Sequence, residues 1–289
     1  MAVKVTTALT PVELRAGRWY KREDYHRLGP VNGAKLRACQ ALIGGMASRG
    51  LQNVVTAASV LSPQHAIVAS VAASLGMTSH HIVGATNDAA LLKHPSTKAA
   101  LAQGAKFHHI GCAYNASLQP AADRLAEKLP FAEVLHYGIT TAERSSRHTV
   151  RAFAEVGGHQ VANLPAEVRT LVIPFGSGNS ACGVLTGLSM YDRMDLAVKL
   201  IGIGPPRLTW LFERLTRINV PIPPDIELFD LHSSGYAKYS DKMPETRDGI
   251  TFHPTYEGKV VRYLDHRRPR WWTDRDGTTC MWIVGAPVQ

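Results

Sequence analysis

A glycine-rich segment stands between two apolar runs of the sequence. Gly176-Ser177-Gly178-Asn179-Ser180 directly follows the apolar run 170–175 and precedes the apolar run 181–190. Glycines let backbone N–H groups turn inward, and a helix N-terminus adds partial positive charge, so this pattern predicts an anion site suited to a phosphate. The alternative is a glycine turn that only lets a strand and a helix pack closely. The segment has neither the lysine of a Walker loop nor the third glycine of the GxGxxG fingerprint.

A lysine at the expected start of a helix is the second feature with chemical potential. Lys35 belongs to Asn32-Gly33-Ala34-Lys35-Leu36-Arg37, where a helical run begins. The helix dipole disfavours a cation there, and together with desolvation it favours the neutral amine that Schiff-base formation needs. The alternative is an ordinary solvated lysine, and on spacing alone that alternative is the better explanation.

A tyrosine and a glutamate stand side by side near the end of the chain. Tyr256 and Glu257 lie in the segment His253-Pro254-Thr255-Tyr256-Glu257-Gly258-Lys259. Taken alone, the proline and the glycine of this segment indicate a turn and nothing more.

Strand-like and helix-like segments alternate along the chain and must position these residues. The expected strands are 53–57, 80–85, 106–110, 133–137, 170–175, 200–203 and 226–231. The expected helices are 34–49, 64–75, 88–103, 117–128, 141–156 and 180–190. This alternation, with continuously apolar strands such as 170–175, predicts a doubly wound α/β fold with parallel sheets covered on both faces. The proline-rich segment 203–230 is expected to be loop-rich.

The composition of the 289 residues is that of a globular protein, with 45% hydrophobic and 19% charged residues. It excludes disordered, collagen-like and coiled-coil chains. No apolar run approaches the roughly 20 residues of a membrane helix, and no secretory signal is evident, so we expect a cytoplasmic protein. The four cysteines lie far apart, which favours free thiols over a metal site. The formal net charge of +9 favours anionic partners, although an ordinary basic surface is the commoner explanation.

Taken together, these segments resemble the fold-type-II pyridoxal-phosphate (PLP) enzymes, specifically the group of 1-aminocyclopropane-1-carboxylate deaminase and D-cysteine desulfhydrase. The resemblance runs from about Trp19 to Gly285 and rests on four motifs in the family's order. They are Lys21-Arg22-Glu23-Asp24 (family K-R-E-D), Gly33-Ala34-Lys35-Leu36-Arg37 (family G-N-K-T-R), the glycine-rich loop that starts at Gly176, and Tyr256-Glu257-Gly258-Lys259 (family Y-E-G-K).

The resemblance implies a role for each matching residue. Lys35 would carry the cofactor pyridoxal 5′-phosphate as a Schiff base, and Glu257 would face the pyridine nitrogen and keep it protonated. The cofactor's phosphate would be bound by Gly176, Ser177, Gly178, Asn179 and Ser180. Tyr256 matches an active-site tyrosine of the group, as does Tyr236 in Ser233-Ser234-Gly235-Tyr236.

The resemblance also implies the domain organisation and the assembly. A large domain would comprise residues 1–46 and 150–289, and a small domain residues 47–149. Both would be doubly wound, with PLP in the cleft between them, and the protein would form a homodimer.

One motif of the group is altered here. Its S-N-x-T motif appears as Ser62-Pro63-Gln64-His65, so the asparagine that would contact the pyridoxal 3′-oxygen is Pro63, which has no donor. We expect Ser62, Gln64 and His65 to bind substrate, with Gln64 or His65 in the place of the asparagine. The cofactor residues are therefore retained while the substrate pocket is altered.

The C-terminal segment is basic and contains interleaved aromatic residues. Its candidate nucleic-acid contacts are Arg267, Arg268, Arg270, Trp271 and Trp272, because arginine pairs with phosphates and aromatic rings stack on bases. A solvated basic loop or a contact with a partner subunit is the favoured alternative. The pairs His80-His81 and His108-His109 are interpreted as sheet residues rather than metal ligands.

Three functions follow from these observations. The leading one is a PLP-dependent lyase that deaminates a small amino acid or eliminates a group from it, through an external aldimine and a quinonoid. The second is the same chemistry, as a decarboxylase or lyase, on an amino acid or amine attached to a DNA base, which would explain both the basic charge and the altered Ser62–His65 segment. The third is a non-catalytic nucleic-acid-binding protein with this fold, which the retained Lys35 and Glu257 argue against.

Overall fold

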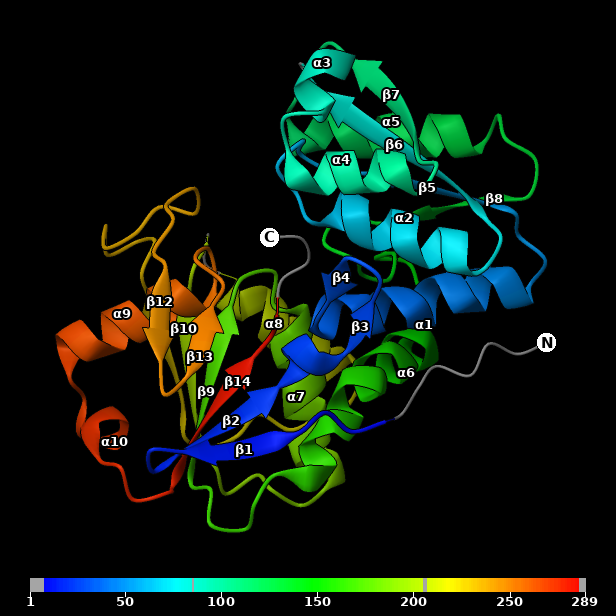
Figure 1. The fold of residues 1–289 in the computed structure, drawn as a ribbon. Helices are drawn as coiled ribbons and strands as arrows, with labels where there is room; N and C mark the ends of the chain where they lie inside the picture. The colour runs from blue at the N-terminus through cyan, green and yellow to red at the C-terminus, as the bar shows by residue number, and fades with distance from the viewer. Residues whose placement is uncertain (1–7, 85, 205–206, 286–289) are drawn as a thin grey trace. The chain divides into compact units, whose positions relative to one another are not determined.

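The structure is a computed structural model that describes residues 8–84, 86–204 and 207–285 (Figure 1). By its internal contacts the described chain divides into two compact units. The first comprises His26–Thr149, and the second comprises residues 8–25 together with Val150–Gly285. Each unit is built around its own sheet, so the two are described separately.

The first unit contains a parallel sheet with the strand order β7-β6-β5-β8. Its strands are β5 (Asn53–Ala57), β6 (Thr78–Gly84), β7 (Lys106–Ile110) and β8 (Ala132–Leu135), and a short hairpin of β3 (Arg27–Leu28) and β4 (Val31–Asn32) stands apart from the sheet. The central strand β5 is buried from Val54 onward, as expected for a parallel strand that is covered on both faces.

Helices cover both faces of this sheet. Val54 shares a core with residues of α1 (Ala34–Ser48) and α2 (Gln64–Ser74), whereas its neighbour Val55 packs with residues of α5 (Asn115–Ala126). Successive side chains of a strand point to opposite faces, so these two cores lie on opposite sides of the sheet. The helix expected over 88–103 is in fact two, α3 (Asp88–Leu91) and α4 (Pro95–Ala102), because Pro95 cannot continue a helix but fits its first position.

The second unit contains a larger sheet with the strand order β1-β2-β14-β9-β10-β11. Its strands are β1 (Val12–Arg15), β2 (Arg18–Arg22), β9 (Thr170–Phe175), β10 (Ala197–Gly202), β11 (Ile226–Asp230) and β14 (Thr279–Ile283). All neighbouring pairs are parallel except β1 with β2. The strand β14 pairs with both β2 and β9, so the two ends of the described chain meet in the middle of one sheet.

Two layers also cover the larger sheet. The alternating residues Leu171 and Ile173 pack with α6 (Arg147–Gly158), α7 (Asn179–Met190) and α8 (Leu208–Arg217). Between them, Val172 packs on the other face with α9 (Glu257–Arg267), α10 (Arg270–Thr273) and the hairpin of β12 (Glu245–Arg247) and β13 (Ile250–Phe252). The short helices η1 (Glu23–Tyr25) and η2 (His159–Asn163) complete the unit.

The structure confirms the doubly wound α/β class and changes details of the expectation. The segment 203–230 is not mainly loop, because α8 occupies its centre between the prolines. The expected strand 80–85 ends at Gly84 in the description, and residue 85 lies outside the described residues. The domain boundary expected at residue 46 stays a prediction, although Leu36 and Ile43 of α1 belong to the core of the first unit. No helix in the described ranges has the length and apolar character needed to cross a membrane.

Candidate functional site

Several of the sequence motifs lie at one edge of the larger sheet. The parallel strands β2, β9 and β14 end at Arg22, Phe175 and Ile283, and parallel strands place their carboxyl ends on the same edge. Ligands of open α/β sheets bind outside this edge. The Lys21–Asp24 motif, the glycine-rich loop and the segment after β14 therefore all belong to the edge at which a ligand site is expected.

The glycine-rich loop connects β9 to the N-terminus of α7. Gly178 is the residue before the helix, and its φ of 85° lies in the left-handed region that favours glycine. A Cβ atom there would lie 2.7 Å from a ring carbon of Trp210, so both the backbone conformation and the packing require glycine. The loop leads directly into the first turn of α7, whose N–H groups have no intrahelical acceptor. This geometry fits the phosphate of PLP.

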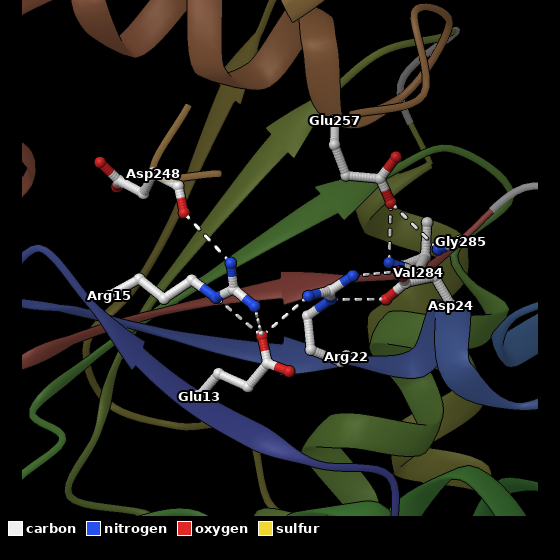
Figure 2. Close-up of polar contacts among 8 residues, drawn as sticks. All are labelled: Glu13, Arg15, Arg22, Asp24, Asp248, Glu257, Val284 and Gly285. Carbon is white, nitrogen blue, oxygen red and sulfur yellow. Dashed lines mark hydrogen bonds and ion pairs between the residues drawn. The ribbon is translucent and has the colours of Figure 1, made fainter. Parts of the chain in front are cut away.

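Glu257 is the first residue of α9, and its carboxylate is fully buried. Figure 2 shows one carboxylate oxygen, Oε1, accepting hydrogen bonds from the backbone N–H groups of Val284 (2.7 Å) and Gly285 (3.1 Å), just beyond β14. The other oxygen, Oε2, is buried and has no hydrogen-bond partner among the described residues. Burial raises the pKa of Glu257 to about 7, against the opposing effect of the backbone hydrogen bonds.

This half-satisfied carboxylate is the observation that tests the expected cofactor. A buried acceptor without a partner costs free energy, and such groups mark sites where a ligand completes the bonding. The protonated nitrogen of a pyridine ring is a donor that would satisfy Oε2 and stabilise the carboxylate as an ion. Together with the glycine-rich loop, Glu257 therefore fits PLP.

The Lys21–Asp24 motif is mainly structural. The buried Lys21 donates to the carbonyl of Thr10 (2.8 Å) and to the side chain of Asn163 (2.7 Å). Arg22 forms a bidentate pair with Asp24 (2.9 and 2.7 Å), which Figure 2 shows beside the Glu257 contacts. The negative charge of Asp24 adds a small contribution to the raised pKa of Glu257. This motif thus supports the sheet edge and its electrostatics.

The two expected tyrosines have different surroundings. Tyr256 precedes α9, and its ring stacks on that of His253 at a centroid distance of 5.0 Å. Tyr236 instead contacts the rings of Tyr263 (5.1 Å) and His266 (5.9 Å). The hydroxyl oxygen that lies 3.3 Å from that of Tyr256 belongs to Tyr239, which the sequence analysis did not select. The sequence around Tyr239 carries no signal that would separate it from Tyr236.

Lys35 lies in the first unit, at the helix start that the sequence predicted. It is the second residue of α1, follows Gly33 with its φ of 95°, and is half-buried. The first turn of α1 contains no acidic residue. The placement of this amine at a helix N-terminus is therefore confirmed, and its bond to a cofactor stays a prediction.

The altered motif Ser62–His65 lies at the start of α2 in the first unit, and its polar atoms are engaged there. Gln64 donates through Nε2 to Thr56 Oγ1 (2.6 Å) and accepts through Oε1 from the N–H of Gly138 (2.8 Å). Ser62 Oγ accepts from the N–H of Gln64 (3.3 Å).

His65 is likewise occupied within the first unit. Its Nε2 lies 3.1 Å from the carbonyl of Ser59 and therefore donates, so its Nδ1 accepts from Nδ1 of His81 at 3.0 Å. Burial lowers the pKa of His65 to about 4, which keeps the ring neutral. The side-chain polar atoms of Gln64 and His65 are thus already used within the first unit, and a role of either residue in place of the missing asparagine stays a prediction.

The basic C-terminal segment is only partly exposed. Trp272 is buried, with its ring 3.3 Å from the guanidinium carbon of Arg18 and its Nε1 donating to Asp265 (2.8 Å), so it cannot stack on a base. Trp271 is half-buried against Phe229. The arginines expected to contact nucleic acid, Arg267, Arg268 and Arg270, are exposed.

The histidine pairs lie in strands, as expected. His80 and His81 belong to β6, and His108 and His109 belong to β7. Within the described residues no three histidine, cysteine or carboxylate side chains gather as metal ligands.

Three known proteins illustrate the similarity of this chain. The O-seryl-dTMP PLP-dependent decarboxylase of Salmonella phage ViI is 29% identical, over 96% of this chain and 81% of the phage protein. The 1-aminocyclopropane-1-carboxylate deaminase of Rhizobium radiobacter is 22% identical, over 93% of this chain and 87% of that enzyme. A crystal structure of a homologue of that deaminase superposes with a TM-score of 0.78 and 20% identity, covering 98% of this chain and 91% of the other.

The chain has the fold of the fold-type-II PLP enzymes. No protein-family model matches it. The expected resemblance is confirmed, and with it the expected class of a PLP-dependent enzyme. Within this fold-type-II architecture, the glycine-rich loop and Glu257 occupy the sheet edge of the second unit, and Lys35 occupies a helix start of the first.

Proposed function

We propose that this chain is a PLP-dependent lyase that removes the carboxyl group from an amino acid attached to the base of a nucleotide. The observation that carries the proposal is the similarity over 96% of the chain to an O-seryl-dTMP PLP-dependent decarboxylase. The replacement of the group's asparagine by Pro63 supports it, because a substrate with a bulky base needs a pocket unlike that for a free amino acid. The formal charge of +9 favours an anionic substrate.

The residues of the site hold the cofactor in this proposal. Lys35 would carry PLP, and the loop from Gly176 to Ser180 would bind the phosphate through backbone N–H groups and hydroxyls. The Oε2 atom of Glu257, which has no partner among the described residues, would accept a hydrogen bond from the ring nitrogen and would keep that nitrogen protonated. When bound, PLP supplies an electron sink for the bond that breaks at Cα.

The chain itself moves the protons. Lys35 is the candidate base of the reaction, and Tyr256 is a candidate acid. The burial of Glu257 keeps water away from its carboxylate, so its charge acts on the ring nitrogen in a region of low dielectric. The Arg22–Asp24 pair fixes the carboxylate of Asp24, whose negative charge contributes to the raised pKa of Glu257.

The exposed arginines give the proposed substrate a second contact when the nucleotide is part of DNA. Arg267 and Arg268 lie at the C-terminal end of α9, and neither forms an ion pair among the described residues. Helix α9 runs from Glu257 to Arg267, and at 1.5 Å per residue this distance is about 15 Å. Nucleotides of one strand follow each other at about 3.4 Å, so these arginines would contact phosphates about four or five nucleotides from the modified base.

A second candidate function is the deamination of a free small amino acid. The match of Tyr256–Lys259 to the deaminase motif favours it, as does the similarity to a 1-aminocyclopropane-1-carboxylate deaminase over 93% of the chain.

The resemblance also implies a homodimer, which sedimentation of the purified protein would test.

The experiment that tests the proposal supplies the protein and PLP with three substrates in parallel. They are an oligonucleotide with one seryl-modified thymine, the corresponding free nucleotide, and free amino acids. Mass spectrometry of the nucleosides should reveal the loss of carbon dioxide from the modified thymine. Ammonia and a keto acid from a free amino acid, with the modified thymine unchanged, would replace the proposal by the second candidate.

The contact with DNA has its own test in the salt dependence of oligonucleotide binding. The double variant Arg267→Ala and Arg268→Ala should lower the slope of log affinity against log salt by about 2. The matched control is Arg124→Ala with Lys128→Ala, which removes two exposed charges near the end of α5. Equal slopes for both double variants would overturn the contact and leave the decarboxylase proposal intact.

A further inference from the structure

The segment 237–243 lies against the start of α9 and is held there at several points. The carbonyl oxygen of Met243 would lie only 2.0 Å from a Cβ atom on Gly258, so the approach requires glycine at this position. The N–H of Met243 donates to the carbonyl of Pro254 (2.9 Å). Gly258 of the Tyr256–Lys259 motif is therefore needed to let this segment reach the helix.

A buried lysine of the same motif, Lys259, holds the segment 237–243 through hydrogen bonds. The side chain of Lys259 has no exposed surface, and its Nζ donates to the carbonyl oxygens of Lys238 (2.6 Å) and Tyr239 (2.9 Å). The ammonium also lies 5.6 Å from the centre of the Tyr239 ring. A buried charge is costly unless it is fully hydrogen-bonded, so these contacts couple the position of the helix start to the backbone at Tyr239.

The contacts of Lys259 place the hydroxyl groups of Tyr239 and Tyr256 close together. The Tyr239 and Tyr256 hydroxyl oxygens are 3.3 Å apart, and their rings meet edge to face at 6.5 Å. Tyr256 is held from the other side by His253, which burial keeps neutral with a pKa of about 4. Tyr239 is 45% exposed, so its hydroxyl can exchange protons with water.

We propose that Lys259 is a positioning residue that fixes Tyr239 against Tyr256, and that this pair of tyrosines, rather than Tyr236 with Tyr256, delivers the proton of the reaction. The inference rests on the proposed function for the identity of the reaction. The contacts of Lys259 and the pairing of the two hydroxyls stand independently of it.

The proposed step balances in protons and electrons. The bond between Cα and the carboxyl carbon breaks, and carbon dioxide leaves without the bonding electron pair. That pair forms the new C–H bond with the phenolic proton of Tyr256. Tyr256 then takes the proton of Tyr239, and water replaces it, so one proton from solvent ends on the substrate carbon.

The first test measures how firmly Lys259 holds the segment 237–243, by amide hydrogen exchange in the protein loaded with PLP. Lys259→Met keeps the length of the side chain but removes the ammonium, and Lys238→Met is the matched control because the Lys238 side chain is exposed while its carbonyl is retained. Amide hydrogen exchange in 237–243 should become at least tenfold faster in Lys259→Met and stay unchanged in Lys238→Met. Unchanged exchange in Lys259→Met, or equal acceleration throughout the second unit, would overturn the positioning role whether or not the protein is a decarboxylase.

The second test asks whether the tyrosines act as a pair. Tyr239→Phe and Tyr256→Phe should each lower kcat by at least tenfold with KM changed less than threefold. The double variant should lose no more than the worse single variant, because residues that act as a unit are not additive. Tyr236→Phe should have a smaller effect than Tyr239→Phe. A larger effect of Tyr236→Phe, or additive losses in the double variant, would overturn the pair.

Discussion

The buried polar side chains at two helix starts of this molecule differ in how completely they are hydrogen-bonded. At the start of α9, Glu257 is fully buried, yet its Oε2 has no partner within the described residues. At the start of α2, both polar ends of Gln64 and both ring nitrogens of His65 are used in internal hydrogen bonds. The first arrangement costs stability unless a ligand completes it, whereas the second contributes stability on its own. The start of α9 therefore keeps an open acceptor for a ligand, whereas the polar groups of Gln64 and His65 are already used.

The largest expected effect follows from removing the incomplete carboxylate. Glu257→Leu should lower kcat by about a hundredfold or more, because the ring nitrogen of the cofactor loses the group that keeps it protonated. Steady-state turnover of the modified nucleotide measures this loss. Glu155→Leu is a control, since Glu155 is a partly exposed acid of the same unit that pairs with Arg151 on α6. Equal losses in the two variants would point to a general effect on the fold.

The same carboxylate predicts a pH dependence of stability without the cofactor. Burial raises the pKa of Glu257 from 4.5 to about 7, so the folded protein binds a proton that the unfolded chain releases above pH 4.5. The free energy of unfolding therefore falls as pH rises from about 4.5 to about 7, by about 3 kcal/mol in total. Urea unfolding of wild type and Glu257→Gln at pH 4.5 and pH 8 measures it. A difference between the two proteins that does not change with pH would contradict this prediction.

The glycine-rich loop offers a smaller effect with a matched control. Gly178→Ala places a Cβ atom 2.7 Å from the Trp210 ring at a φ of 85° and should destabilise the protein by about 1 to 3 kcal/mol. Gly176→Ala meets only Ile203 at an ordinary 3.7 Å and should change stability by less than about 1 kcal/mol. Thermal unfolding without PLP compares the stability of the two variants. Equal destabilisation would show that the loop has another conformation.

The smallest effect on activity is expected at the start of α2. Gln64→Leu removes two buried hydrogen bonds and should cost about 2 kcal/mol of stability. Because both ends of Gln64 face the protein, kcat/KM should stay within about twofold of wild type at a temperature where the variant is folded. A tenfold rise in KM with unchanged stability would show that Gln64 binds substrate after all.

The sequence predicted the parts of the fold that depend on local pattern. The strands β5, β7 and β9 have the expected bounds, and in β5 and β9 runs of apolar residues mark the strand directly. The strand β2 was missed, since its sequence RWYKR reads as polar. Its Lys21 is buried only because Thr10 and Asn163 supply acceptors from elsewhere in the chain.

In the candidate site, too, the residues of contiguous motifs could be predicted, whereas contacts between distant residues could not. The glycine loop, Lys35 and Glu257 could be recognised because their motifs are contiguous in the sequence. The pairing of Tyr239 with Tyr256 could not, because it depends on the backbone carbonyls that Lys259 holds. The hydrogen bonds of Gln64 and His65 also depend on partners, Gly138 and His81, that lie far away in the sequence.

The central claim is that PLP is bound to this chain through Lys35. The most direct measurement is borohydride reduction of the protein with PLP, followed by digestion and mass spectrometry of the peptides, for wild type beside Lys35→Ala. The claim predicts a pyridoxyl group on the peptide that contains Lys35, and the loss of both this label and the visible absorbance band in Lys35→Ala. A label on another lysine, or an unchanged absorbance band in Lys35→Ala, would contradict it.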